Sequence, residues 1–97
     1  MSTLVLLEGQ VQPDKIGEMK SSLAEVFPDT RSYEGSQGID GYFNMDDQGN
    51  MVILEKWGSR GQHEKYLQWR TETGVMDKLG SMLVGPPSIK YFDRVEA

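Results

Sequence analysis

The segment from Met51 to Trp57 strongly constrains the fold of this chain, because it carries apolar side chains at both odd and even positions. It follows the turn-forming residues 46–50 and is stopped by a Gly-Ser pair, a pattern typical of a strand. Successive side chains of a strand point to opposite faces of its sheet, so both faces of this strand need cover. One face combines Glu55 with Trp57, and we expect that face to line a ligand pocket.

The remaining periodicity predicts three further strands and two helical regions. A capping-box pattern, Ser59 with Gln62, marks the start of the second helical region. Pro28 is expected to end the first helix, and Thr30 to Gly38 is expected to be a loop. The expected strands are 3–11, 39–45, 51–57 and 88–93, and the expected helices are 13–27, 60–70 and, after an interruption at 71–74, 75–83.

The order β-α-β-β-α-β predicts an α+β, ferredoxin-like fold, in which a four-stranded antiparallel sheet carries both helical regions on one face. Residues 1–97 are expected to form a single domain with a modest core. The sheet face away from the helices still carries apolar side chains. We therefore expect two copies to pack face to face as a homodimer, a dimeric α/β barrel.

The charge balance and the missing residue types restrict the function. Fifteen acidic and ten basic side chains give a net charge of −5, which argues against nucleic acid or an anionic membrane surface as a partner. The sequence has no cysteine and a single histidine, so no thiolate metal site, and no metal, is expected. The aliphatic run from Leu4 to Leu7 is too short to span a membrane and no leader is visible, so we expect the cytosol.

Several short motifs along the chain are shared with a known family. They are Thr30-Arg31, Glu34-Gly35, the segment Ile53-Leu54-Glu55-Lys56-Trp57-Gly58-Ser59-Arg60, a helix with His63 and Tyr66-Leu67, and the closing Gly85-Pro86-Pro87. In this combination the chain resembles the antibiotic biosynthesis monooxygenase (ABM) family over nearly its whole length. The resemblance implies a dimeric α/β barrel. It also implies a cofactor-independent monooxygenase that oxidises a small aromatic quinol or phenol with O₂, without metal, haem or flavin.

Oxygenation without a cofactor makes chemical demands that several residues can meet. The bound phenol or quinol must lose a proton, and the site needs donors for the resulting anion and a dry, aromatic-lined cavity. Histidine has an ordinary pKa of about 6.5, which suits a base near neutrality. The candidate catalytic residues share a helix face and are His63, Tyr66 and Arg70. The candidate substrate-binding residues are Trp57, Glu55, Phe43 and Ile53.

Simpler structural roles stand beside these assignments. Trp57 and Tyr66 suit the core or a dimer contact. His63 suits a water-facing first helical turn, and Arg70 suits a charge on the surface or at the dimer rim. Glu55 lies between two apolar residues on its face, so it needs either a pocket or a cationic partner. The candidate cationic partners are Arg31, Lys90 and Arg94.

Two departures from the family pattern favour a second hypothesis. Ile53 stands where quinone-forming members can carry an asparagine, and Tyr66 stands where many members have a histidine. The alternative is a non-catalytic dimer of the same fold that binds a small apolar ligand or assists another enzyme. A third hypothesis is an isomerase or lyase on the same barrel, which would act without consuming O₂.

Overall fold

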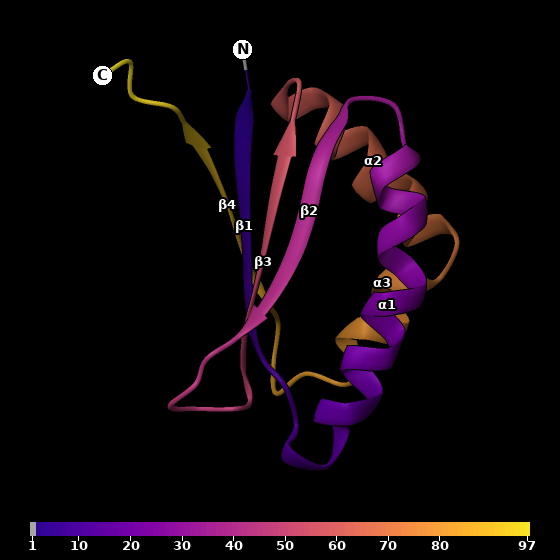
Figure 1. Cartoon of the computed structure of the whole chain (residues 1–97). Helices are drawn as coiled ribbons and strands as arrows, with labels where there is room; N and C mark the ends of the chain where they lie inside the picture. The colour runs from indigo at the N-terminus through magenta and orange to yellow at the C-terminus, as the bar shows by residue number, and fades with distance from the viewer. Residues whose placement is uncertain (1) are drawn as a thin grey trace.

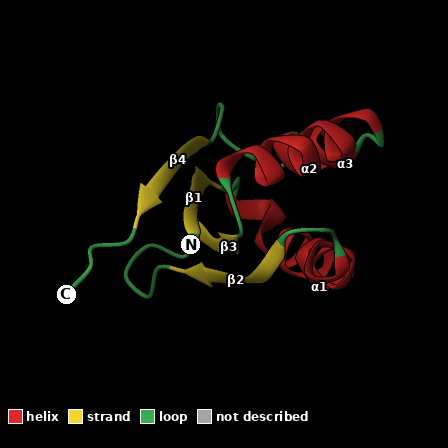
Figure 2. Ribbon diagram, turned by 90° about the horizontal axis from the view of Figure 1, so that it is seen from above, coloured by secondary structure: helices red, strands yellow, loops and turns green. Residues whose placement is uncertain are grey.

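The computed structural model describes residues 2–97, so residue 1 of the expected domain 1–97 lies outside the described residues. The strands are β1 (Thr3–Gln10), β2 (Ser36–Phe43), β3 (Asn50–Trp57) and β4 (Ser88–Asp93), and the helices are α1 (Ile16–Ser32), α2 (Arg60–Glu72) and α3 (Val75–Gly80), with a short 3₁₀ turn at Pro13–Lys15. The strands form one antiparallel sheet in the order β2-β3-β1-β4. The helices all lie on the same side of this sheet (Figures 1 and 2). This arrangement confirms the expected α+β, ferredoxin-like fold.

The strand β3 lies inside the sheet between β2 and β1. The register aligns four residues in one row across the sheet: Tyr91 of β4, Val5 of β1, Glu55 of β3 and Ile39 of β2. Paired residues of neighbouring strands point to the same face, and here it is the face that the helices cover. The row therefore places a carboxylate and a phenol in an otherwise apolar layer.

The two faces of the sheet differ in burial. On the inner face, Val5, Met51 and Trp57 are buried beneath the helices. On the outer face, Tyr42 and Phe92 remain 51% and 42% exposed. Figure 2 shows that no described helix covers this outer face. Within a single chain, the helices therefore cover the apolar side chains of the inner sheet face and leave those of the outer face exposed.

Pro28 does not end α1, contrary to the sequence-based expectation. The helix continues past it to residue 32. Proline lacks a backbone N–H and weakens a helix locally. Here the residues on both sides of it are anchored, since Phe27 packs in the core and Thr30 is fully buried. Tertiary packing therefore outweighs local propensity, and much of the expected loop from 30 to 38 is helix or strand.

Other boundaries also differ from expectation. The strand β2 begins earlier, at Ser36, and includes a bulge before Gly38, whose φ is 140°. The helix α3 is shorter than expected, and Leu83 follows it in a turn and forms an isolated β-bridge with Val11. The expected break between α2 and α3 is confirmed. Gly74 sits there with a φ of 84°, a conformation that glycine adopts without steric cost.

Candidate functional site

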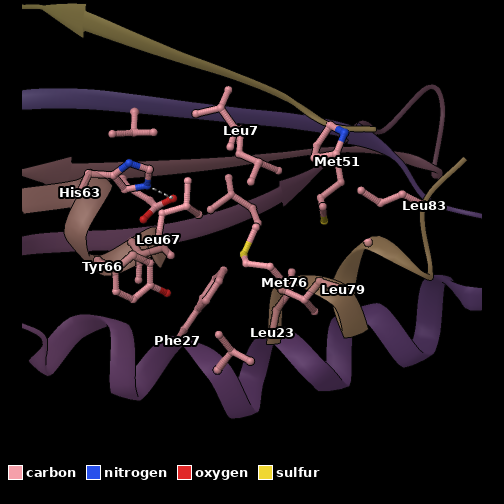
Figure 3. Close-up of a pocket in the computed structure, with 18 of the residues that line it drawn as sticks. Leu7, Leu23, Phe27, Met51, His63, Tyr66, Leu67, Met76, Leu79 and Leu83 are labelled. Carbon is pink, nitrogen blue, oxygen red and sulfur yellow. Dashed lines mark ion pairs between the residues drawn. The ribbon is translucent and has the colours of Figure 1, made fainter. Parts of the chain in front are cut away.

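A cavity of about 140 Å³ lies between the sheet and the helices. Figure 3 shows His63 at one end of it and Leu83 at the other. The polar residues in its wall are Glu55, His63 and Tyr66, and they gather at the His63 end. The rest of the wall is apolar and includes Leu7, Leu23, Ile53, Leu67, Met76 and Leu79. The molecule thus contains an apolar chamber with one polar end.

Glu55 is a buried carboxylate on β3, with 4% of its surface exposed. An ionised carboxylate in such a position is costly unless it is paired and hydrogen-bonded. Its Oε1 accepts a hydrogen bond from Trp57 Nε1 at 3.1 Å, because residues two apart on a strand share a face. Its Oε2 lies 3.8 Å from Nε2 of His63. Glu55 is therefore oriented by Trp57 and faces His63.

The cationic partners expected for Glu55 are not its partners in the structure. Arg31 lies 4.0 Å from the Asp40 carboxylate instead. Lys90 points to the outer face of the sheet, since β4 alternates and its neighbour at position 91 points inward. Within residues 2–97, neither Lys90 nor Arg94 forms an ion pair with Glu55. The expected salt bridge is replaced by the contact with a histidine.

His63 is held over the sheet by the first turn of α2 and is 1% exposed. The helix starts after Ser59, whose hydroxyl accepts the backbone N–H of Gln62 at 3.2 Å, as the capping-box pattern predicts. Nδ1 of His63 lies 2.8 Å from the hydroxyl of Tyr91, while Nε2 faces Glu55. The expectation of a water-facing histidine is wrong, because the capped first turn directs this side chain onto the sheet.

Tyr91 completes a chain of three polar side chains at the cavity end and was not among the expected site residues. Burial raises the pKa of its phenol, the Glu64 carboxylate raises that pKa further, the Arg60 guanidinium lowers it, and Glu55 adds a smaller rise. The net pKa is raised, so the hydroxyl stays protonated near neutrality and can donate to the imidazole Nδ1 or accept from it. The sequence signal for this residue is the alternation of β4, which places it with Ile89 on the inner face.

Arg70 is buried rather than a surface charge, with 4% of its surface exposed. Its Nε donates to the Tyr66 hydroxyl at 2.9 Å. One of its terminal nitrogens donates to the Val26 carbonyl at 2.8 Å and to Thr30 Oγ1 at 3.2 Å. The hydroxyl oxygens of Tyr66 and Thr30 are 2.6 Å apart. Tyr66 thus borders the cavity while its hydroxyl is engaged with Arg70 and Thr30.

The other candidate residues fall into two groups. Ile53 lines the cavity. Trp57 is fully buried in an aromatic cluster with Tyr33 and lies outside the cavity wall. Phe43, at the end of β2, also lies outside that wall. The structure therefore brings Glu55, His63, Tyr66 and Ile53 to the cavity and leaves Trp57, Phe43 and Arg70 beside it.

Two further features are absent from the part of the chain that the structure describes. No three His, Asp or Glu side chains in residues 2–97 are grouped so that they could hold a metal ion. None of the helices in that range is long and apolar enough to cross a membrane.

Comparison with known proteins gives matches through structure. No family model matches the sequence, and no curated protein matches it. A conserved protein from Methanosarcina mazei superimposes with a TM-score of 0.89 at 18% identity, covering 98% of this chain and 94% of that chain. An antibiotic biosynthesis monooxygenase gives a TM-score of 0.86 at 17% identity, with 96% and 98% of the two chains covered. The chain has the ABM fold.

One of the structural matches is an enzyme whose reaction type is known. SnoaB from Streptomyces nogalater, described as a cofactor-independent oxygenase, gives a TM-score of 0.84 at 11% identity, covering 99% of this chain and 95% of that chain. These structural matches confirm the resemblance that the sequence motifs indicated. Identities of 11% to 18% establish a shared architecture, and the chemistry must come from the residues of the cavity. In this ABM fold the polar end of the cavity is built from β3, α2 and β4.

The raised pKa of Tyr91 predicts a loss of stability in alkaline solution. The folded protein holds the phenol proton more tightly than the unfolded chain. The stabilisation is therefore fully present below the ordinary tyrosine pKa of about 10 and is lost as pH rises through the folded-state value. We expect the free energy of unfolding of the native protein to fall more steeply above about pH 10 than that of Tyr91→Phe. Urea unfolding followed by tryptophan fluorescence measures this slope.

Tyr33→Phe is the matched control for this prediction, because Tyr33 follows the end of α1 and lies outside the cavity wall. It removes the same hydroxyl group without disturbing the polar end of the cavity. Its stability should fall with pH as steeply as that of the native protein. Equal slopes for the native protein and Tyr91→Phe would contradict the partly buried position of this phenol beside carboxylates.

Proposed function

We propose that this protein is a cofactor-independent monooxygenase that oxidises a small aromatic phenol or quinol with O₂. The observation that carries the proposal is the Glu55–His63 pair at the polar end of an apolar cavity. The ABM fold, shared with SnoaB, supports it. The net charge of −5 supports a small ligand over nucleic acid or an anionic membrane surface as the partner.

His63 is the base that takes the hydroxyl proton of the bound phenol. Tyr91 holds Nδ1 at 2.8 Å and so orients the ring, which leaves Nε2 for the substrate. Proton transfer creates an imidazolium next to a phenolate. The Glu55 carboxylate, 3.8 Å from Nε2, stabilises the imidazolium, and burial strengthens that attraction because little water screens it.

The phenolate is the electron donor to O₂. One electron passes to O₂, which gives a phenoxyl radical and superoxide, and the two combine at the ring carbon beside the phenolic carbon. The imidazolium returns its proton to form a hydroperoxide, and loss of water leaves a second ring carbonyl. One oxygen atom stays in the quinone product. The other leaves as water, with one hydrogen from the hydroxyl group and one from the ring carbon.

The remaining candidate residues support this chemistry. Ile53 and the apolar wall keep water away from the phenolate and the radical pair. Trp57 orients the carboxylate of Glu55 through its indole N–H. Tyr66 borders the ring of the substrate and is itself held by Arg70. Phe43, paired with Met51 across the sheet, supports the cavity from outside its wall.

Replacing His63 by alanine tests the base directly. We expect His63→Ala to lower kcat for O₂ uptake about 100- to 10,000-fold, the usual contribution of a general base. Uptake is measured with an oxygen electrode, with a metal chelator present. The panel contains one- and two-ring phenols and quinols, including a dihydroxynaphthalene.

Gln68→Ala, on the exposed side of the same helix, is the matched control and should keep the native rate. Unchanged turnover in His63→Ala would remove His63 from the mechanism. A product that contains no heavy oxygen after a reaction under ¹⁸O₂ would contradict oxygen insertion.

A non-catalytic binding protein is the second candidate function. Its support is the nearly complete apolar lining of the cavity, together with Ile53 at the position where an asparagine could have served as a polar group. Such a protein would bind members of the same panel and show no O₂ uptake with any of them. Conversion of a bound compound without O₂ consumption would instead favour an isomerase or lyase.

We further propose that two copies pair through the outer sheet face to form a dimeric α/β barrel. The register and alternation of the strands place a band of apolar side chains on this face: Leu4, Leu6, Tyr42, Val52, Leu54 and Phe92. A hollow of about 310 Å³ on the same face is bordered by Leu4, Tyr42 and Leu54. Such a contiguous apolar band is typical of an interface.

Leu54→Asp tests this pairing, because a carboxylate at the centre of the band would have to be buried unpaired in the dimer. We expect the native protein to sediment as a dimer at micromolar concentration and Leu54→Asp to dissociate at least about 100-fold more readily. Gln68→Asp introduces the same group on the helical side and should leave the dimer intact. A native protein that sediments as a stable monomer would contradict the barrel.

A further inference from the structure

The cavity that carries the proposed function has room for one aromatic ring. Its volume is about 140 Å³. An engineered apolar cavity of roughly 150 Å³ in another protein binds benzene, whereas sites for drug-sized ligands occupy about 300–1,000 Å³. A second fused ring therefore exceeds the space between the sheet and the helices.

The polar atoms that remain free at the cavity end suit a single hydroxyl group. The Tyr66 hydroxyl is already engaged with Thr30 and Arg70, and Oε1 of Glu55 already accepts an indole hydrogen bond. Oε2 of Glu55 and Nε2 of His63 remain, 3.8 Å apart, which is too far for a direct hydrogen bond. A single hydroxyl group about 2.7–2.9 Å from Nε2 can donate its one proton to that nitrogen.

The opposite end of the cavity favours a hydrocarbon group. Among residues 2–97, the side chains that line that end are apolar and include Met76, Leu79 and Leu83 (Figure 3). A second hydroxyl placed there would give up its hydrogen bonds to water without replacement. A short alkyl group placed there would instead bury apolar surface, which favours binding.

We infer that the ligand class of this cavity is a single-ring phenol with a short alkyl group opposite its hydroxyl. The hydroxyl donates its proton to Nε2 of His63 beside Glu55, and the alkyl group points toward Leu79. This inference rests on the proposed function, because the phenol placed in this way presents its proton to Nε2 of His63. The product is the corresponding alkyl-substituted 1,2-quinone, formed together with one water per O₂ consumed.

Isothermal titration calorimetry with 4-ethylphenol in oxygen-free buffer tests the inference, with three comparison compounds. Ethylbenzene lacks the hydroxyl, hydroquinone replaces the alkyl group by a second hydroxyl, and 2-naphthol adds a fused ring. We expect each to bind at least about tenfold more weakly than 4-ethylphenol. Equal or tighter binding of 2-naphthol would overturn the limit to one ring, and equal binding of ethylbenzene or hydroquinone would overturn the hydroxyl placement.

A variant at the apolar end tests the direction of the ligand. Leu79→Phe fills the space assigned to the alkyl group, so 4-ethylphenol should bind at least about tenfold more weakly while phenol itself keeps its affinity within about threefold. Val84→Phe, at a 60% exposed position nearby, should change neither affinity. Equal weakening of both ligands in Leu79→Phe would contradict the assigned direction. If that variant fails to fold, the ligand series on the native protein still decides the inference.

Binding and turnover separate this inference from the proposed function. Tight binding of 4-ethylphenol with no O₂ uptake would support the ligand class and overturn the monooxygenase. O₂ uptake with a dihydroxynaphthalene and no binding of 4-ethylphenol would support the monooxygenase and overturn the ligand class.

Discussion

A buried carboxylate sets the chemistry of this molecule. Removing an ionised Glu55 from water costs several kcal/mol. The fold is stable only if hydrogen-bonding and charged partners offset this cost. The strand supplies one partner two residues away, the Trp57 indole at 3.1 Å, and α2 supplies the other, the His63 imidazole at 3.8 Å. Tyr91 then holds the far side of the same imidazole at 2.8 Å. The polar end of the cavity exists because the buried Glu55 carboxylate requires these partners.

The surrounding structure keeps that polar end dry. The row of paired strands places apolar side chains on both sides of Glu55, since Val5 and Ile39 are its neighbours across the sheet. The cluster of Arg70, Tyr66 and Thr30 joins α2 to α1 through buried hydrogen bonds, which holds the two helices at a fixed separation above the sheet. A cavity remains where the apolar side chains of the two layers do not meet. The same packing that stabilises the domain therefore creates an apolar cavity beside an acid–base pair.

Much of the fold could be predicted from the sequence, and the site only in part. A short apolar run bounded by turn-forming residues identified β3, and the Ser59 cap identified the start of α2. Pro28 was misleading, because its local effect on α1 is outweighed by buried neighbours that no local pattern reveals. The strand periodicity also placed Glu55 and Trp57 on one face of β3. It could not give the distance between Glu55 and His63, which depends on how α2 crosses the sheet, or the register that brings Tyr91 to the same place.

The most direct test of this account is a nuclear Overhauser spectrum of the imidazole of His63, which is the single histidine and gives unambiguous signals. In the structure its ring centre lies 5.4 Å from that of Tyr91 and 5.5 Å from that of Trp57. We expect cross-peaks from the imidazole protons to both aromatic rings. An imidazole that shows cross-peaks to neither ring and exchanges freely with solvent would contradict the buried acid–base pair and the chemistry proposed for it.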